Sequence, residues 1–139
     1  MIARGDKVFV DTGAWIALAI VRDSLHERAV SGWSTLERSS ARVYTSVPVV
    51  LETFTYLDRK GSRELAQRWR ASLRAVPRLQ ILGCAAADLE AASPWLERTD
   101  LHRLGLVDAT SFVVMRKHSI RVAFAFDVHF AIAGFRLVE

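Results

Sequence analysis

Four acidic residues, far apart along the chain, could together bind a divalent metal ion. Asp11 and Asp127 each follow a short apolar run, whereas Glu52 and Asp108 lie early in apolar segments with helical character. Two carboxylates about 4 Å apart repel each other by roughly 4 kcal/mol at an effective dielectric constant near 20. A hard cation such as Mg²⁺ or Mn²⁺ removes this repulsion and accepts oxygen ligands. Such an ion can activate a water molecule beside a bound phosphate, so the acids predict phosphodiester hydrolysis without a covalent nucleophile.

The segments that must position these acids alternate between strand and helix patterns. Short apolar runs without polar alternation predict buried strands at residues 8–10, 42–45, 79–82, 121–126 and, as a short fifth strand, 135–138. Helical patterns follow at residues 14–21, from Ser24, from Pro48 toward Gly61, from Ser62, from about Ala86, and over 106–118. This order predicts an α/β fold, a three-layer α/β/α sandwich with a central, mostly parallel sheet of four to five strands. Ligands of such sheets bind at the carboxyl ends of the strands, so we expect all four acids in one cleft.

Polar residues and prolines suggest where several helices begin and end. Ser24 with Glu27 matches a capping box, which predicts that Ser24 caps the helix after it. Ser46 is expected to cap the next helix, where Pro48 suits the first turn. Pro94 is expected to kink or break the helix that starts near Ala86.

Length and composition are typical of one folded domain, expected to cover residues 1–139. Hydrophobic residues make up 51% of the 139 residues, and no run has the length of a signal-peptide core or of a membrane-spanning helix. The single cysteine, Cys84, has no internal partner for a disulfide, which favours a cytoplasmic location. The net charge of +4 is a modest bias toward anionic partners.

The residues around the acids resemble the PIN-domain family, and in particular the VapC-like toxins of bacterial toxin–antitoxin modules. The matching segments, read from the sequence, are VDTGA at 10–14, SVPVVLE at 46–52, GLVDATSF at 105–112 and FDVHF at 126–130, with Gly134-Phe135 behind. Their order and spacing span nearly the whole chain. The resemblance implies a PIN fold, metal-dependent endoribonuclease activity on RNA, an antitoxin partner and homodimerisation.

The same resemblance implies the roles of individual residues. It assigns metal binding to Asp11, Asp108 and Asp127, with Glu52 as the helix glutamate that acts through metal-bound water. Thr12 matches a hydroxyl position that supports the first aspartate or a metal-bound water. Ala125 departs from the family pattern, which often has Thr or Ser two residues before the last aspartate, so this side chain cannot supply a supporting hydrogen bond.

Each of these residues also has a simpler structural interpretation. Asp11 and Asp127 could be turn residues, and Asp108 could only complement a helix dipole. His129 is interpreted as a helix-start or packing residue rather than a catalytic base. The stripe of Arg63, Arg70 and Arg74 is interpreted as a solvated helix face, with RNA contact as the alternative.

A protease and a binding module are among the alternatives to a nuclease. The Asp11-Thr12-Gly13 turn resembles that of retroviral-type aspartic proteases, but those are all-β dimers, and the helical periods over 24–40 and 62–76 contradict that architecture. The remaining alternative is a catalytically inactive PIN-like module that binds RNA or protein. Such a module would bind its partner equally well after metal removal.

Overall fold

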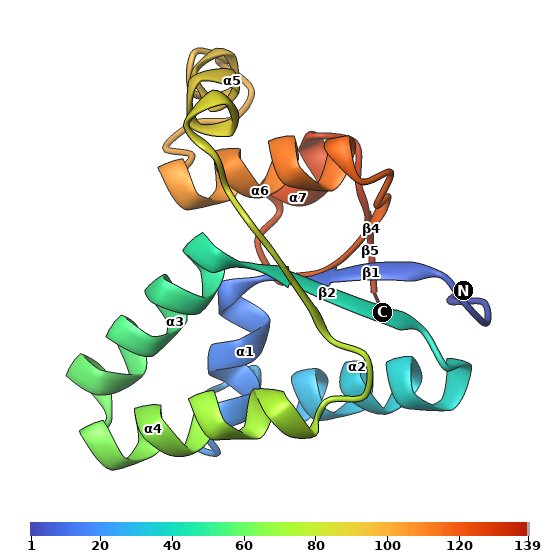
Figure 1. The fold of residues 1–139 in the computed structure, drawn as a ribbon, viewed down its shortest axis with the longest axis vertical. Helices are drawn as coiled ribbons and strands as arrows, with labels where there is room; N and C mark the ends of the chain where they lie inside the picture. Colours follow the sequence, from blue (N-terminus) through green and yellow to red (C-terminus); the bar gives the residue numbers. More distant parts are fainter. Residues whose placement is uncertain (139) are drawn as a thin grey trace.

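Five parallel strands form one sheet in the order β3-β2-β1-β4-β5 in the computed structural model of the protein, which describes residues 1–138 (Figure 1). The strands are β1 (Lys7–Val10), β2 (Arg42–Ser46), β3 (Gln80–Leu82), β4 (Val122–Phe124) and β5 (Arg136–Leu137). Because every neighbouring pair is parallel, all carboxyl ends lie at one edge of the sheet and all amino ends at the other. The strand order reverses at β1, between β2 and β4, which is where open α/β sheets place their ligands.

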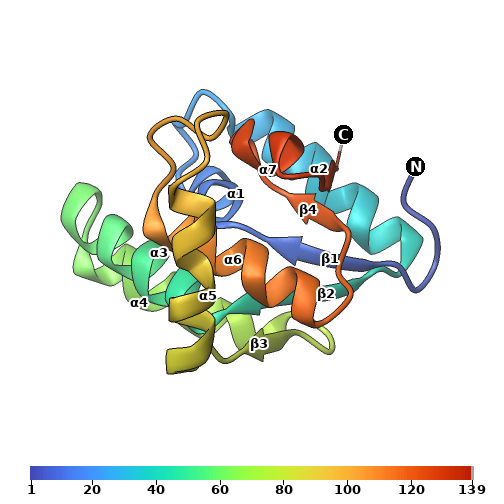
Figure 2. The same ribbon diagram turned by 90° about the horizontal axis from the view of Figure 1, so that it is seen from above.

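Seven helices complete the expected α/β/α sandwich. They are α1 (Thr12–Ala19), α2 (His26–Ser39), α3 (Val47–Lys60), α4 (Arg63–Ser72), α5 (Ala86–Leu96), α6 (Leu106–Lys117) and α7 (His129–Ile132), with a short 3-10 turn at Leu73–Ala75. Helices α1, α2 and α4 cover one face of the sheet, whereas α5, α6 and α7 lie on the other (Figures 1 and 2). Helix α3 leaves the carboxyl end of β2 and packs against α1, α4 and α6.

Aromatic clusters fill the space on both sides of the sheet. Trp15 packs against Trp33 and Trp69, with ring centroids 5.6 and 5.9 Å apart. On the other face Phe112 packs edge-on against Phe130 at 4.9 Å. Full burial of each such ring stabilises the fold by about 1.5–3 kcal/mol. The central strand between the two clusters is inaccessible at all of its last three residues, Val8 to Val10.

The expected helix starts at Ser46 and Ser62 are confirmed. The Ser46 hydroxyl accepts a hydrogen bond from the backbone N–H of Val49 at 3.3 Å, and Ser62 accepts one from Leu65 at 3.0 Å. The first cap orients α3, the helix that carries Glu52.

Two local predictions are wrong. Ser24 does not cap α2, which begins at His26, because the Asp23 carboxylate accepts the backbone N–H of Leu25 at 2.8 Å and holds a turn there. Pro94 does not break α5, which continues to Leu96. Since the proline lies in the last turn of the helix, it removes only one backbone hydrogen bond and leaves the preceding turns intact.

Within residues 1–138, no helix combines the length and the apolar character needed to cross a membrane.

Candidate metal centre

Asp11 lies at the carboxyl end of the central strand, immediately before α1. Its backbone N–H donates to the carbonyl of Phe124 at 3.0 Å, and its own carbonyl accepts the N–H groups of Ala14 and Trp15 that begin the helix. The side chain is only 4% exposed. Burial raises the pKa of Asp11 to about 7, and the charges of Glu52 and Asp127 act in the same direction.

Asp108 lies in the first turn of α6, on the other face of the sheet, and approaches Asp11 from that side. Burial raises its pKa to about 8, with further contributions from Asp11, Asp127 and Glu52 in that order. A hydrogen-bond contact with Asp127 also favours the protonated form of Asp108. A raised pKa on two neighbouring carboxyls means that this cluster lacks a compensating positive charge among the described residues.

The strand before Asp127 is shorter than expected: β4 ends at Phe124, not at Phe126. Two further residues therefore separate Asp127 from the strand. Its side chain is 36% exposed. A ligand oxygen of Asp127, one of Asp108 and a ring nitrogen of His129 all lie within 4.8 Å of one another, which is close enough to share one metal ion.

Glu52 stands at the exposed rim of the cluster, on α3. Its negative charge raises the pKa of both Asp11 and Asp108, so it lies within electrostatic reach of both. The side chain also lines a hollow of about 570 Å³ together with Leu51, Tyr56 and Val107. Four acids from four separate segments therefore meet at the carboxyl edge of the sheet, as the strand pattern predicted.

His129 is a member of this cluster that the sequence interpretation missed. Its backbone N–H donates to Asp127 Oδ1 at 2.9 Å, while its ring Nδ1 lies 2.8 Å from the same oxygen. The ring Nε2 lies 2.8 Å from the carbonyl oxygen of His102, which can only accept, so Nε2 carries the hydrogen. In the neutral ring, Nδ1 then presents a lone pair toward the carboxylate. The expected position of His129 at a helix start is confirmed, since α7 begins at this residue. Its place two residues after Asp127 was the sequence signal for its membership of the acidic cluster.

Two buried oxygens beside the acids have no hydrogen-bond partner among residues 1–138. They are Asp11 Oδ1 and Thr12 Oγ1, both on residues less than a tenth exposed. A buried polar atom without a partner costs roughly 1–3 kcal/mol, so such atoms usually face a water or an ion. The donor set of carboxylate oxygens, one hydroxyl and one imidazole nitrogen suits a divalent cation with several waters. The residues present thus fit the metal that the acidic cluster suggested.

The sequence and the fold are similar to those of known proteins. A model of the PIN domain family matches residues 8–136. The 23S rRNA-specific endonuclease VapC20 of Mycobacterium tuberculosis is 41% identical over 130 residues, which cover 92% of this chain and 95% of that protein. The crystal structure of VapC20, described as a Sarcin-Ricin loop cleaving toxin, superposes with a TM-score of 0.81 at 38% identity, over 92% of this chain and 95% of that one.

More distant structures share the fold alone. FitAcB from Neisseria gonorrhoeae has a TM-score of 0.65 at 17% identity, covering 95% of this chain and 96% of that chain. VapBC2 from Rickettsia felis, bound to a DNA fragment from its promoter, has a TM-score of 0.67 at 12% identity, covering 94% and 96%. The family match over nearly the whole sequence, together with a relative that is 41% identical, shows that this chain belongs to the PIN-domain family.

Proposed function

We propose that this chain is a metal-dependent endoribonuclease that hydrolyses RNA phosphodiester bonds at the acidic cluster, within a single nuclease domain. The observation that carries the proposal is the buried, unpartnered Oδ1 of Asp11, which lies among three further acids that raise its pKa or share its cleft. A carboxylate in that position destabilises the fold unless a cation neutralises it. Mg²⁺ or Mn²⁺ is the cation proposed.

The three aspartates and Glu52 would have different roles, because they differ in burial. Asp11, Asp108 and Asp127 would hold the ion, and Thr12 would offer its hydroxyl to a water in the same cleft. The backbone N–H of His129 donates to Asp127 and holds this carboxylate in place, and the ring Nδ1 beside it would be a further ligand atom for the ion. Glu52 is the exposed acid, so its carboxylate is the one best placed to accept a proton from an attacking water. When bound, the ion would supply Lewis-acid activation of the water and of the phosphate.

The substrate and partners proposed follow the similar toxin. Because VapC20 is named for 23S rRNA, ribosomal RNA is the first substrate to test. A toxin of this kind would be held inactive by an antitoxin protein, would form a homodimer, and would meet its RNA in the cytoplasm. The chain would then be the toxin of a toxin–antitoxin pair.

A cleavage assay tests the proposal directly. The purified chain is incubated with 23S rRNA in the presence of Mg²⁺, Mn²⁺ or EDTA, beside the variants Asp11→Asn and Asp108→Asn. We expect metal-dependent cuts that EDTA abolishes and that each variant slows by at least about 100-fold. The control is Asp58→Asn, which removes an acid that pairs with Arg63 on the surface, and this variant should cut at the wild-type rate.

Two results would contradict the nuclease. Equal cleavage by the wild type and both variants would assign the activity to a contaminant. RNA binding without any cleavage, unchanged by EDTA, would instead favour the inactive binding module.

A further inference from the structure

Positive charge gathers at the sheet edge opposite the acids. Lys7 is in register with Arg42 across β1 and β2. Continuing the register of β1 with β4 by one residue places Arg121 beside Lys7, and Arg78 lies in the turn that leads into β3, next to the start of β2. The basic edge, defined here as Arg78, Arg42, Lys7 and Arg121, therefore runs across four adjacent strands. At the usual strand spacing it spans roughly 14 Å between its outer backbones.

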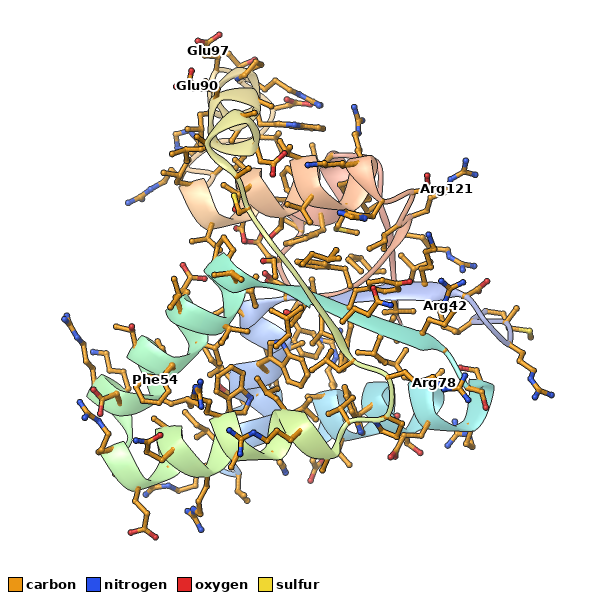
Figure 3. The ribbon with its side chains drawn as sticks, viewed as in Figure 1. Arg42, Phe54, Arg78, Glu90, Glu97 and Arg121 are labelled. Atoms are coloured by element: carbon orange, nitrogen blue, oxygen red, sulfur yellow. The ribbon has the colours of Figure 1, made fainter. Side chains whose placement is uncertain are left out.

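The three arginines of the basic edge are exposed and carry no salt bridge within residues 1–138. Figure 3 shows Arg42, Arg78 and Arg121 at the end of the molecule where the strands begin, whereas the labelled Phe54 on α3 lies at the opposite end. Lys7 is partly used by the fold, since its Nζ donates to the carbonyl of His118 at 2.9 Å behind α6. The free charge of the edge therefore belongs to the arginines.

A buried tyrosine keeps two of these cations close to each other. Arg42 donates to the Tyr44 hydroxyl at 3.0 Å, and Lys7 Nζ lies 5.9 Å from the centre of the same ring. Tyr44 is only 4% exposed. Like charges held side by side repel each other, so a built pair of this kind favours an anionic occupant.

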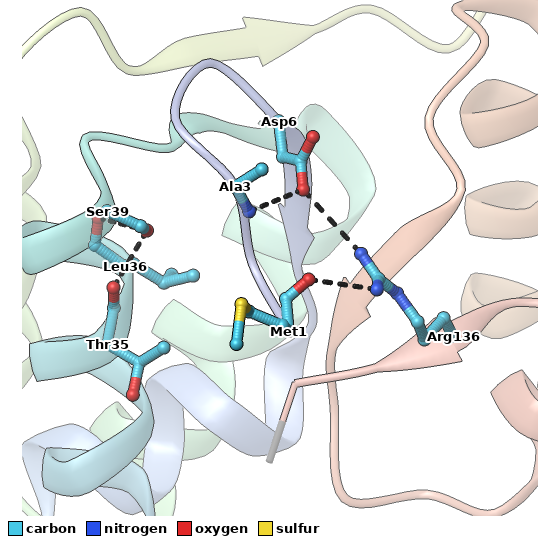
Figure 4. Close-up of polar contacts among 7 residues, drawn as sticks. All are labelled: Met1, Ala3, Asp6, Thr35, Leu36, Ser39 and Arg136. Atoms are coloured by element: carbon cyan, nitrogen blue, oxygen red, sulfur yellow. Dashed lines mark hydrogen bonds and ion pairs between the residues drawn. The ribbon is translucent and has the colours of Figure 1, made fainter.

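A fifth basic residue near this edge is already neutralised. Arg136, at the start of β5, reaches Asp6 at 3.6 Å and donates to the carbonyl of Met1 at 2.9 Å (Figure 4). This residue ties the first residues of the chain to β5. Arg136 therefore differs from Arg78 and Arg121, which form no ion pair with any of the described residues.

Two surface hollows adjoin the outer arginines of the edge, and both are lined by further arginines. One, of about 360 Å³, is lined by Arg70, Arg74 and Arg78 and extends along β3 to Ile81 and to Val50 of α3. The other, of about 330 Å³, lies at the opposite end of the edge and is lined by Arg116 and Arg121. Guanidinium groups around a concave surface match the geometry of phosphate oxygens, to which arginine can donate two parallel hydrogen bonds.

We propose that the basic edge, with these two hollows, is a second RNA-binding surface that contacts the phosphate backbone of a folded RNA away from the cleavage site. The proposal rests on the ribonuclease function proposed above. A strand of four residues separates the two edges by about 13 Å, which exceeds the Debye length of roughly 8 Å at physiological salt. Screening therefore leaves the edge little influence on a short RNA in the acidic cleft, whereas a large folded RNA can reach both places.

Binding and cleavage measured on two RNAs separate this surface from the catalytic centre. Binding of 23S rRNA is measured with Asp11→Asn protein in EDTA over a series of salt concentrations, with and without Arg78→Glu and Arg121→Glu together. We expect the double variant to bind at least about 10-fold more weakly and the salt slope to fall by about 2, one for each lost phosphate contact. In the catalytically intact background, kcat/KM should fall on 23S rRNA and stay within about 2-fold on the shortest fragment that the wild type cuts.

The control is Arg68→Glu, which makes the charge change of one of the two substitutions at an exposed arginine of α4. Arg68 lies two residues before Arg70, about 200° away around the helix, so it faces away from the hollow. If the double variant loses thermal stability, Arg78→Gln with Arg121→Gln replaces it, and a lower salt slope is again expected.

Salt slopes and affinities equal to those of the control would overturn the proposal. So would a parallel loss of kcat/KM on the short fragment, because the arginines would then act at the catalytic centre. A wild-type chain that binds 23S rRNA but never cuts it would refute the nuclease and leave the binding arm of this test intact.

Discussion

Trp15 donates a hydrogen bond of 3.2 Å from its indole nitrogen to the hydroxyl of Thr45, which in turn donates to the carbonyl of Val10 at 2.9 Å. This chain of contacts joins α1 and β2 to the residue just before Asp11. Both Trp15 and Thr45 are buried, so no water replaces these bonds when they are lost. The position of the innermost acid thus depends on a polar link within an otherwise apolar core.

Replacing Thr45 with valine tests this link. Thr45→Val keeps the shape but removes both hydrogen bonds, leaving the indole N–H and the Val10 carbonyl without a partner. We expect the free energy of unfolding to fall by about 1–3 kcal/mol in urea denaturation. Thr35→Val is the control, since Thr35 bonds only within α2 near the surface, and it should change stability by less than about 0.5 kcal/mol. Equal effects of the two substitutions would show that the hydrogen bonds of Thr45 do not stabilise the fold.

Gly32 allows α2 to approach the sheet directly beneath Phe124. A Cβ at this position would lie 2.9 Å from two atoms of the Phe124 ring, which is fully buried. We expect Gly32→Ala to lower the melting temperature, because overpacking of about 1–3 kcal/mol exceeds the helix propensity gained by alanine. Gly83→Ala is the matched control, since nothing lies within 4 Å of its added Cβ. A rise in melting temperature for Gly32→Ala would show that Phe124 moves aside freely.

The metal-free protein should be less stable in alkaline than in mildly acidic buffer. The folded-state pKa values of Asp11 and Asp108, about 7 and about 8, exceed the ordinary aspartate value of 3.8, so the folded state binds more protons than the unfolded chain. The stability they contribute is full below the unfolded pKa and is lost as pH rises through 7 to 8. We expect the melting temperature in EDTA to fall between about pH 5.5 and pH 8.5 by several degrees.

The variant Asp11→Asn provides the comparison for this pH dependence. An amide of the same shape has no charge to bury, so the variant should melt above the wild type at about pH 8.5 and show a weaker fall with pH. Identical pH profiles for the two proteins would contradict the burial of a charged Asp11.

Divalent metal should reverse that instability, and His129 should strengthen the effect. An ion that binds only the folded state at about 100 times its dissociation constant adds roughly 2.7 kcal/mol of stability. Because the ring of His129 offers Nδ1 to the same cluster, His129→Gln should weaken Mn²⁺ affinity by about 10–100-fold, measured from the rise of melting temperature with Mn²⁺ concentration. His118→Gln is the control, since that histidine follows the last turn of α6, whereas Asp108 lies in its first turn. Equal Mn²⁺ titrations for both variants would restrict His129 to packing.

Negative and positive charges lie at opposite edges of the sheet, a separation that the modest net charge does not reveal. Acids gather where the strands end, and free arginines gather where the strands begin. A nuclease needs a negative site to hold a cation and a positive surface to hold the polyanion that the cation attacks. Separate edges allow both charges to be large without neutralising each other.

Much of this arrangement could be predicted from the sequence. Short apolar strands without polar alternation predicted a buried parallel sheet, and the segments around Asp11, Glu52, Asp108 and Asp127 predicted the PIN fold, both of which are confirmed. The prediction worked because burial on both faces leaves a direct mark on strand composition. The expected convergence of the acids followed from parallel topology, and the mutual effects of the four carboxyls on their pKa values agree with it.

Other features were decided only by the tertiary structure. Asp23 rather than Ser24 holds the turn before α2, because its carboxylate takes the backbone N–H of Leu25. Pro94 stayed inside α5, because it lies in the last turn of that helix. The second role of His129 required the carbonyl of His102, which is distant in sequence. The row of cations required the strand order that sets the turn before β3 next to the start of β2. Local patterns determine which elements form and which faces they bury, whereas contacts between remote side chains depend on register and packing, which no single segment encodes.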